Sequence, residues 1–358
     1  MKKLCIVFGG ASSEHDISII TAMQLTKNLE SFYDLEKIYI GLDNKFYFAT
    51  KVEGVDFFQN KNSINLKEVC FFNNAVYFNG LIKKKLCDVD CVVNCCHGGI
   101  GENGDLAGFF ATLGIKCTSA NCLSAHIAMD KTLTKKLLQN IVPTIKGFKI
   151  TKNNFNRRKQ QVAKKLKNDL IVKPNSLGSS IGVKVCTKRD YIEQVNAIFE
   201  MDDDALVEER VVNIAEYNQA CYKTKEGLVL CAIEQPLTKS NFLSFDDKYK
   251  GNNKTKGRDR VIPAEISPEL ENQIIDYTSQ IYEKLNMNGV VRIDYIFDKD
   301  KNKLYFNEIN TIPGSMAFYL FEPVGIDYVS LISQIVENAA EIKKFTYFDT
   351  NILKDKTI

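Results

Sequence analysis

Two short segments near the C-terminal end combine acidic, amide and basic side chains inside otherwise apolar runs. GVVRIDYIFD carries Arg292 and Asp294, and KLYFNEIN carries Glu308 and Asn310. Residues two apart in a β-strand share one face of the sheet. A turn at residues 300–302 would therefore place Asp294 opposite Glu308 and Arg292 opposite Asn310. Facing carboxylates repel each other unless a cation lies between them, and hard oxygen ligands suit Mg²⁺.

The same hairpin also fits a solvated sheet face on which Arg292 is the counter-ion of the carboxylates. These residues alone leave both interpretations open.

A glycine- and serine-rich loop, NSLGSSIG, joins two predicted strands as the tip of an antiparallel hairpin. Its backbone N–H groups and the hydroxyls of Ser179 and Ser180 could fold over phosphate groups. It is not a Walker A loop, because no Gly-Lys-[Ser/Thr] follows, and an ordinary hairpin tip fits it equally well. Lys173 lies in the preceding apolar strand, where its charge requires an anionic partner. This lysine favours the phosphate interpretation.

Two further glycine-rich loops follow apolar strands. HGGIGENG contains Gly99, Gly101 and Gly104 in the spacing of a dinucleotide-binding turn, but the acidic residue expected about 20 positions later is missing. A turn that directs N–H groups at an anionic ligand is the remaining interpretation. In GGASSEHDIS, Glu14 stands at a helix entry, where a capping box of Ser13 and Asp16 is the structural alternative.

The length and composition are those of a globular protein with more than one domain. With 358 residues and 45% hydrophobic side chains, two or three domains are expected. A net charge of +3 argues against nucleic acid or an anionic membrane as partner. The N-terminal apolar run is too short for a signal peptide, and no window reaches the length of a membrane helix. Eleven cysteines, several in apolar runs, are typical of reduced thiols in a cytoplasmic protein, and a metal site at Cys95-Cys96-His97 lacks a second ligand pair.

The order of predicted elements indicates a mixed α/β protein in three parts. Residues 1–119 alternate strands and helices, as in a parallel sheet covered by helices, with short aromatic strands between residues 43 and 86. The segment CDVDCVVNCC is predicted to form one buried strand. Residues 120–207 contain the Gly/Ser hairpin, and residues 208–358 contain the acidic hairpin. A polar stretch at 236–263 is long enough to be a functional lid.

Taken together, these segments resemble the D-alanine–D-alanine ligases of the ATP-grasp superfamily. The resemblance spans residues 8 to 314. The segments that carry it are FGGASSEHDIS, HGGIGENGDLAG, MDK, VKPNSLGSSIG, VEERVV with EYN, FDDKYK, VRIDY and NEINTIPG. It implies a three-domain ATP-grasp fold, in which an N-terminal domain precedes two ATP-grasp subdomains, and ATP-dependent joining of two D-alanines for peptidoglycan precursors.

The resemblance also implies roles for individual residues. ATP would be bound by Lys131, Lys173, Gly178, Ser179, Ser180, Glu208, Val211, Glu216, Phe242 and Lys248. Two Mg²⁺ ions, with Mn²⁺ as a substitute, would be held by Asp294, Glu308 and Asn310. Catalysis would use Glu14, Ser179, Tyr249, Arg292 and the backbone N–H of Gly314. Substrate would be bound by Glu14, His97, Tyr249, Tyr319 and Leu320. A homodimer is also implied.

One departure from the family pattern concerns the second amino acid. The family commonly continues Pro-Gly with a polar segment whose last Ser, with the following Leu, binds the acceptor carboxylate. Here SMAFYL places Tyr319 at that Ser. The acceptor could therefore be D-alanine, D-serine or another small amino acid. Two other function classes remain as alternatives: a Rossmann-type oxidoreductase and a catalytically inert nucleotide-binding protein.

Overall fold

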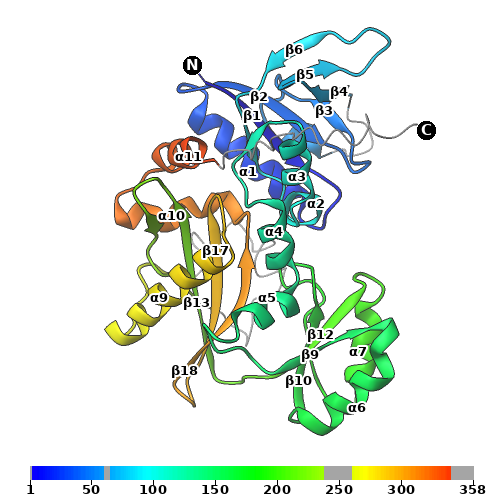
Figure 1. The fold of residues 1–358 in the computed structure, drawn as a ribbon, viewed down its shortest axis with the longest axis vertical. Coiled ribbons are helices and arrows are strands. Elements are labelled where there is room, and N and C mark those ends of the chain that lie inside the picture. The colour runs from blue at the N-terminus through cyan, green and yellow to red at the C-terminus, as the bar shows by residue number, and fades with distance from the viewer. Residues whose placement is uncertain (1, 60–64, 238–259, 340–358) are drawn as a thin grey trace, which may run out of the picture.

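The computed structural model describes residues 2–59, 65–237 and 260–339, which form three larger sheets and a two-stranded ribbon with helices around them (Figure 1). In these residues, no helix combines the length and the apolar character needed to cross a membrane. The mixed α/β architecture agrees with the class predicted from the sequence.

The first sheet has eight strands in the order β6-β5-β4-β3-β2-β1-β7-β8. Its parallel half consists of β1 (Lys3–Gly9), β2 (Asp34–Ile40), β7 (Cys91–Asn94) and β8 (Lys116–Cys117). Its antiparallel half consists of β3 (Phe46–Phe48), β4 (Lys67–Phe72), β5 (Ala75–Phe78) and β6 (Lys85–Asp88). The aromatic pieces between residues 43 and 86 therefore extend the parallel sheet at one edge.

The helices of this part are α1 (His15–Leu29), α2 (Gly99–Glu102) and α3 (Asp105–Thr112). One sequence prediction is wrong here. CDVDCVVNCC is not a single strand, because β6 ends at Asp88 and β7 begins at Cys91. Between them, Asp90 accepts a hydrogen bond from the Lys3 backbone N–H at 2.8 Å. The chain turns at this point, so β6 lies at the far edge of the sheet from β7.

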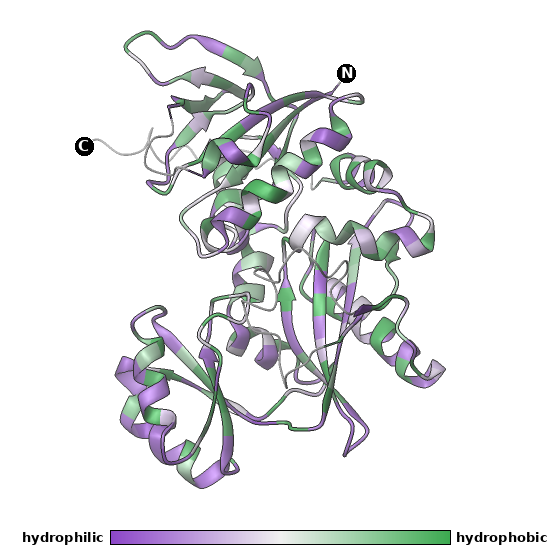
Figure 2. Cartoon of the chain, turned by 180° about the vertical axis from the view of Figure 1, so that it is seen from behind, coloured by the Kyte–Doolittle hydropathy of each residue, from purple (hydrophilic) through white to green (hydrophobic). Residues whose placement is uncertain are grey.

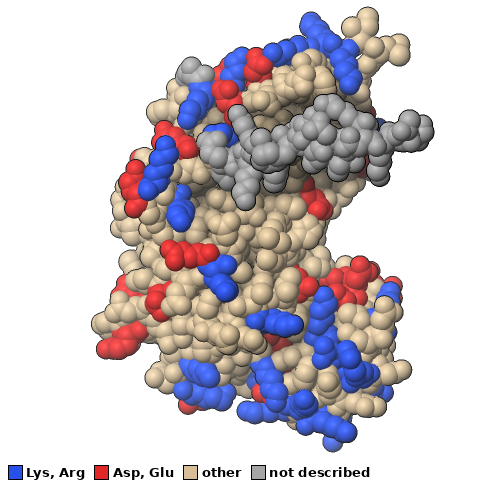
Figure 3. Space-filling model, viewed as in Figure 1, with Lys and Arg blue, Asp and Glu red and all other residues tan. Residues whose placement is uncertain are grey.

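The second sheet is antiparallel, in the order β11-β10-β12-β9. Its elements are β9 (Gly147–Thr151), α6 (Phe155–Lys165), β10 (Asp169–Pro174), β11 (Lys184–Thr187), α7 (Tyr191–Ile198) and β12 (Asp204–Glu209). Figure 2 shows that α6 and α7 carry both hydrophilic and hydrophobic residues, as expected for helices with one face on a core. Basic side chains gather over this part, interspersed with acidic ones, on the face seen in Figure 3.

The third sheet is also antiparallel, in the order β14-β13-β17-β18. Its strands are β13 (Ile214–Lys223), β14 (Leu228–Leu230), β17 (Val291–Asp298) and β18 (Lys303–Asn310). The helices α4 (Cys122–Met129), α5 (Lys131–Leu138) and α9 (Pro268–Lys284) share a hydrophobic core with it. A two-stranded ribbon, β15 (Gln235–Pro236) with β16 (Arg260–Val261), lies beside β13.

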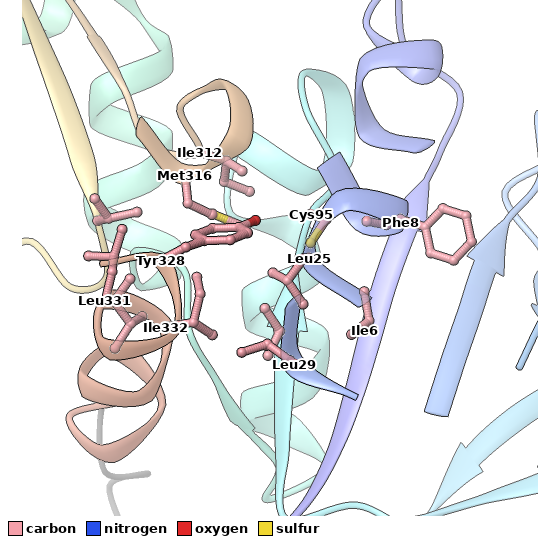
Figure 4. Close-up of a cluster of buried hydrophobic side chains, with 14 of the residues drawn as sticks. Ile6, Phe8, Leu25, Leu29, Cys95, Ile312, Met316, Tyr328, Leu331 and Ile332 are labelled. Atoms are coloured by element: carbon pink, nitrogen blue, oxygen red, sulfur yellow. The ribbon is translucent and has the colours of Figure 1, made fainter. Parts of the chain in front are cut away.

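The chain after β18 returns to the first sheet. Two helices, α10 (Phe318–Phe321) and α11 (Tyr328–Glu337), pack with α1 in one core. Figure 4 shows Met316, Tyr328 and Leu331 facing Leu25 and Leu29 across this core. The apolar residues that follow Pro313-Gly314 thus join the first and third sheets, which explains why this segment is so hydrophobic.

Candidate active site

The acidic hairpin has the register that the sequence predicts. In the β17–β18 pair, Asp294 lies opposite Glu308 and Arg292 opposite Asn310, with a bulge directly after Asp294. The Arg292 guanidinium donates from Nε and Nη2 to the two oxygens of Asp294 at 2.7 and 2.8 Å. Asn310 Nδ2 donates to Asp294 Oδ2 at 3.0 Å. All four side chains line one cavity of about 780 Å³.

This group offers oxygen ligands of the kind that Mg²⁺ prefers. Asp294 and Glu308 supply carboxylates, and Asn310 supplies an amide oxygen. In the described part of the chain, no group of three or more His, Cys, Asp or Glu side chains could hold a metal. A site with two carboxylates is the kind that Mg²⁺ completes with substrate phosphates and water. The donor set therefore fits a phosphate-bound magnesium.

Two lysines face the same hairpin from other elements. Lys131 at the start of α5 lies with Nζ 3.4 Å from Glu308 Oε2 and donates to the Leu177 carbonyl at 2.6 Å. Lys173 on β10 donates to Asn307 Oδ1 at 3.2 Å. Both line a second cavity of about 90 Å³ beside the first, together with Val211. The cations that could meet a polyphosphate thus come from a helix packed on the third sheet and from a strand of the second.

Glu216 lines both of these cavities, whereas Glu208 lines neither of them. The Glu208 carboxylate is held by two lysines instead: Lys135 donates to Oε1, and Lys173 Nζ lies 2.9 Å from Oε2. Although burial opposes its charge, these lysines lower the pKa of Glu208 to about 2. In this conformation the Glu208 carboxylate thus faces the two lysines, and its contact with adenine, implied by the resemblance, stays a prediction.

Sequence reasoning missed Lys135. The available signal was its position one helical turn after Lys131, which puts both on one face of α5.

The Gly/Ser loop joins β10 to β11 as predicted, and it contacts the N-terminal part. Ser179 and Ser180 adopt left-handed backbone angles, with φ of 54° and 58°. The Ser179 hydroxyl donates to Glu14 Oε1. A Cβ on Gly178 would lie 3.2 Å from Glu14 Oε2, so glycine permits the close approach. Ser180 lines both cavities, so the loop forms part of the wall shared by them.

Glu14 is the N-cap residue of α1 and makes no side-chain capping bond there. The helix thus begins after Glu14, one residue later than a capping box of Ser13 and Asp16 would place it, and the Glu14 carboxylate turns toward the Gly/Ser loop. On its other side lies Gly98, where a Cβ would come within 3.0 Å of Glu14 Oε2. Glu14 is 9% exposed, so its charge lies almost buried at the meeting point of two glycine-rich loops.

His97 and Glu102 also line the large cavity. Thr21 Oγ1 lies 2.9 Å from His97 Nε2, and burial lowers the pKa of His97 to about 4, so the ring is neutral near pH 7. Glu102 was not singled out from the sequence, although it lies in HGGIGENG. It accepts from the backbone N–H of Gly98 at 3.0 Å and of Ile312 at 3.3 Å. Burial, and then the charge of Glu14, raise the pKa of Glu102 to about 7.

The far end of the cavity contains Tyr319. Its hydroxyl donates to Glu234 Oε2 at 3.4 Å, and the Arg260 guanidinium lies 4.6 Å from its ring centroid. Arg260 Nη1 and Glu234 Oε1 form an ion pair of 2.9 Å, and Asn218 Nδ2 donates to Glu234 Oε2 at 3.1 Å. Glu234 and Arg260 were also missed. A glutamate within the apolar run LVLCAIEQ was a usable signal for the first of them.

The remaining predicted residues fall into three groups. The backbone of Gly314 lines the large cavity. Leu320 is fully buried in the core shared with α1, so its side chain does not face the cavity. Phe242, Lys248 and Tyr249 lie outside the described residues, as does most of the polar stretch 236–263.

Comparison with known proteins adds an independent line of evidence. A family model described as the D-ala D-ala ligase N-terminus matches residues 3–120, and its C-terminal counterpart matches residues 138–337. The D-alanine–D-alanine ligase of Thermosipho melanesiensis is 32% identical, with 99% of each chain covered. That of Campylobacter jejuni subsp. doylei is 33% identical, with 93% of each chain covered.

Solved structures agree with these relatives. The D-alanine–D-alanine ligase from Helicobacter pylori matches with a TM-score of 0.79 at 26% identity, over 95% of this chain and 99% of that one. A D-Ala:D-Ser ligase from Enterococcus faecalis reaches the same TM-score at 24% identity, which shows a shared fold only. These matches overturn the oxidoreductase alternative and confirm the ATP-grasp fold class. The chain belongs to the D-alanine–D-alanine ligase family of the ATP-grasp superfamily.

Proposed function

We propose that the protein joins two D-alanines into D-alanyl-D-alanine while ATP is converted to ADP and phosphate, as a step of peptidoglycan precursor synthesis. One observation carries the proposal. A single cavity brings the acidic hairpin together with the Glu14–Ser179 pair, and the lysine-lined cavity adjoins it. The groups proposed to bind phosphate, metal and amine thus line two adjoining cavities.

The nucleotide would lie between the second and third sheets. Lys131 and Lys173 would neutralise its phosphates, and the Gly178–Gly182 loop would cover them with N–H groups. Val211 and Glu216 would contact the base and the ribose, and Phe242 and Lys248 would join from the polar stretch. Glu208 would contact adenine while its carboxylate keeps its two lysines.

Family membership implies that the protein uses ATP and a divalent metal. We propose two Mg²⁺ ions, replaceable by Mn²⁺, at Asp294, Glu308 and Asn310. Bound there, the metal would neutralise charge on the phosphoryl group during transfer.

In the first half-reaction, the carboxylate of one D-alanine attacks the γ-phosphorus, forming an acyl phosphate and releasing ADP. Glu14 would bind the ammonium of that D-alanine, since it is an almost buried carboxylate at the cavity wall. Ser179 and Tyr249 would fix the orientation of Glu14 and the substrate, and neutral His97 would complete the pocket. Exclusion of water is required, because an acyl phosphate otherwise hydrolyses.

In the second half-reaction, the amine of the acceptor attacks the acyl carbon, and phosphate leaves. Arg292 and the Gly314 N–H would stabilise the oxyanion that forms, as fixed donors do in other acyl transfers. The Tyr319 hydroxyl and the backbone N–H of Leu320 would bind the acceptor carboxylate. Arg260 lies against the ring of Tyr319 and would add positive charge there.

D-Alanine is the acceptor that the relatives favour. The relatives at 32–33% identity are named D-alanine–D-alanine ligases. The D-serine alternative came from Tyr319 at the family's serine position, and the D-Ala:D-Ser ligase among the solved structures shares only the fold.

We also propose three features that rest on family resemblance or sequence. These are a homodimer, a cytoplasmic location, and a division into domains at residues 1–119, 120–207 and 208–358, with a closing lid at 236–263.

The decisive experiment is to incubate the protein with ATP, Mg²⁺ and D-alanine, alone and with D-serine or D-lactate, and to measure product masses. We expect D-alanyl-D-alanine in every mixture and one ADP per dipeptide. A mixed dipeptide as the main product would reassign the acceptor. Absence of ADP release with every amino acid would favour an inert nucleotide-binding protein.

A further inference from the structure

A buried lysine behind the nucleotide cavity has no role in the reaction as described so far. Lys135 lies on α5, one turn beyond Lys131, and only 7% of it is exposed. It lines neither of the two cavities that contain the site. Burying an ammonium group is costly unless a partner compensates for the lost hydration, so its contacts indicate what it is for.

Those contacts form a chain that leads to the cavity wall. Lys135 donates to one oxygen of Glu208, and the other oxygen of Glu208 lies 2.9 Å from Lys173 Nζ. Lys173 in turn donates to Asn307 Oδ1 at 3.2 Å, on the strand that carries Glu308. Of the three charged groups, only Lys173 reaches the cavity.

We propose that Lys135 is a positioning residue of the nucleotide site: it holds Glu208, and Glu208 fixes the ammonium of Lys173 where a phosphate would bind. This inference rests on the proposed nucleotide site. Three elements, α5, β12 and β10, supply one residue each to the chain, so it ties the second sheet to the helix packed on the third.

Charge arithmetic gives the direction of the effect. Lys135, Glu208 and Lys173 together carry a net charge of +1 when all are ionised. Without Lys135, Glu208 and Lys173 become a neutral pair, and the carboxylate is free to follow Lys173. Bringing a polyphosphate to that wall then loses a favourable charge interaction at low dielectric. Binding of the nucleotide should weaken, whereas binding of D-alanine should not.

The charge of Lys135 is itself sensitive to pH. Burial lowers its pKa from 10.5 to about 8, and the repulsion of Lys173 and Lys131 adds to this, while Glu208 opposes it. Glu308, on β18, faces Lys131 at 3.4 Å and also raises the pKa of Lys173. As pH rises through about 8, Lys135 loses its proton, and the chain reaches the same neutral state as a variant without the lysine. An arginine at this position would stay protonated.

The test compares Lys135→Met and Lys135→Arg with Lys136→Met, which changes an exposed lysine on the same helix. Binding of Mg-ADP without D-alanine is measured by calorimetry, and the KM values for ATP and D-alanine are measured from pH 7 to 10. For Lys135→Met at pH 7 we expect roughly tenfold weaker Mg-ADP binding and a matching rise in the KM for ATP, with the KM for D-alanine unchanged. In the wild type and in Lys136→Met, the KM for ATP should rise only above pH 8. In Lys135→Arg, the KM for ATP should stay nearly constant from pH 7 to 10.

Wild-type Mg-ADP affinity in Lys135→Met would overturn the proposal. So would an alkaline rise that persists in Lys135→Arg, and that comparison suffices if Lys135→Met does not fold. If the wild type formed no dipeptide but bound Mg-ADP, the proposed function would fail, while the Mg-ADP titrations would still decide the role of Lys135.

Discussion

Two parts of the candidate site are built in different ways. The phosphate corner (Lys131, Lys173, Asp294, Glu308 and Asn310) takes its side chains from a helix start and from three regular strands. The acceptor corner (Glu234, Arg260, Ser315 and Tyr319) takes its residues from the short β15–β16 ribbon and the residue before it, and from the short helical turns after Pro313. Residues 315–317 all have φ between 51° and 55°, a left-handed run that non-glycine residues rarely adopt.

The two corners hold their side chains in place by different means. At the phosphate corner, strand register sets the spacing of charges, and opposite charges hold the side chains in place. At the acceptor corner, Met316, Ala317 and Leu320 are buried in the core, and this packing turns Tyr319 toward the cavity. The residues proposed to bind phosphate and metal thus lie on regular elements, and Tyr319, proposed to bind the acceptor, lies on a segment positioned by packing.

The largest effect is expected at the phosphate corner. Asp294→Asn removes a carboxylate from the proposed metal site. Since loss of a mere hydrogen-bond partner of a metal ligand costs about 10- to 100-fold, we expect kcat to fall about a hundredfold or more. Circular dichroism should show an unchanged fold. The control is Asp300→Asn, at the exposed hairpin turn. Near-normal turnover of Asp294→Asn would contradict the assignment of Asp294 as a metal ligand. It would also contradict the view that the phosphate corner is the more sensitive of the two.

A smaller effect is expected at the acceptor corner. Tyr319→Phe removes the hydroxyl but keeps the ring against Arg260. A hydrogen bond to a charged group contributes about 1.5–3 kcal/mol, so the KM of the acceptor should rise roughly tenfold while that of the donor changes little. Steady-state kinetics measured over a range of D-alanine concentrations give both KM values, one for the donor site and one for the acceptor site. The control Tyr305→Phe changes a tyrosine on β18 that lines neither cavity. Equal changes in both KM values would count against a role specific to the acceptor.

A third prediction concerns stability rather than turnover, at the segment that leads into the acceptor corner. Glu102 accepts from the Ile312 N–H, directly before the acceptor segment. Its pKa of about 7 in the folded protein lies above the ordinary 4.5, so the stabilisation it gives is complete below pH 4.5 and is lost as pH rises through 7. Glu102→Gln should remove this loss, which amounts to about 2 kcal/mol of unfolding free energy between pH 5 and 8.

Urea denaturation at both pH values measures the effect, with Glu283→Gln on the exposed face of α9 as control. A pH dependence identical in wild type and Glu102→Gln would contradict the assigned pKa.

The same contrast explains how far the sequence could be interpreted. The parallel sheet, the Gly/Ser hairpin and the register of Asp294 with Glu308 follow from periodicity and turn position, which are local properties. The ion pairs of Glu208 with Lys135 and of Glu234 with Arg260 join residues far apart in the chain, so no local pattern predicts them. The left-handed run after Gly314 depends on burial between two sheets, and the split of CDVDCVVNCC depends on which edge each half joins. Both are tertiary effects that override local preference.

The central claim is that this cavity activates one amino acid as an acyl phosphate and passes it to a second. Turnover of D-alanine labelled with ¹⁸O in its carboxylate tests this most directly, with the released phosphate analysed by mass spectrometry. We expect each dipeptide formed to be accompanied by one phosphate carrying one ¹⁸O atom, because the bridging oxygen of the acyl phosphate leaves with phosphorus. Dipeptide formed with unlabelled phosphate would contradict it.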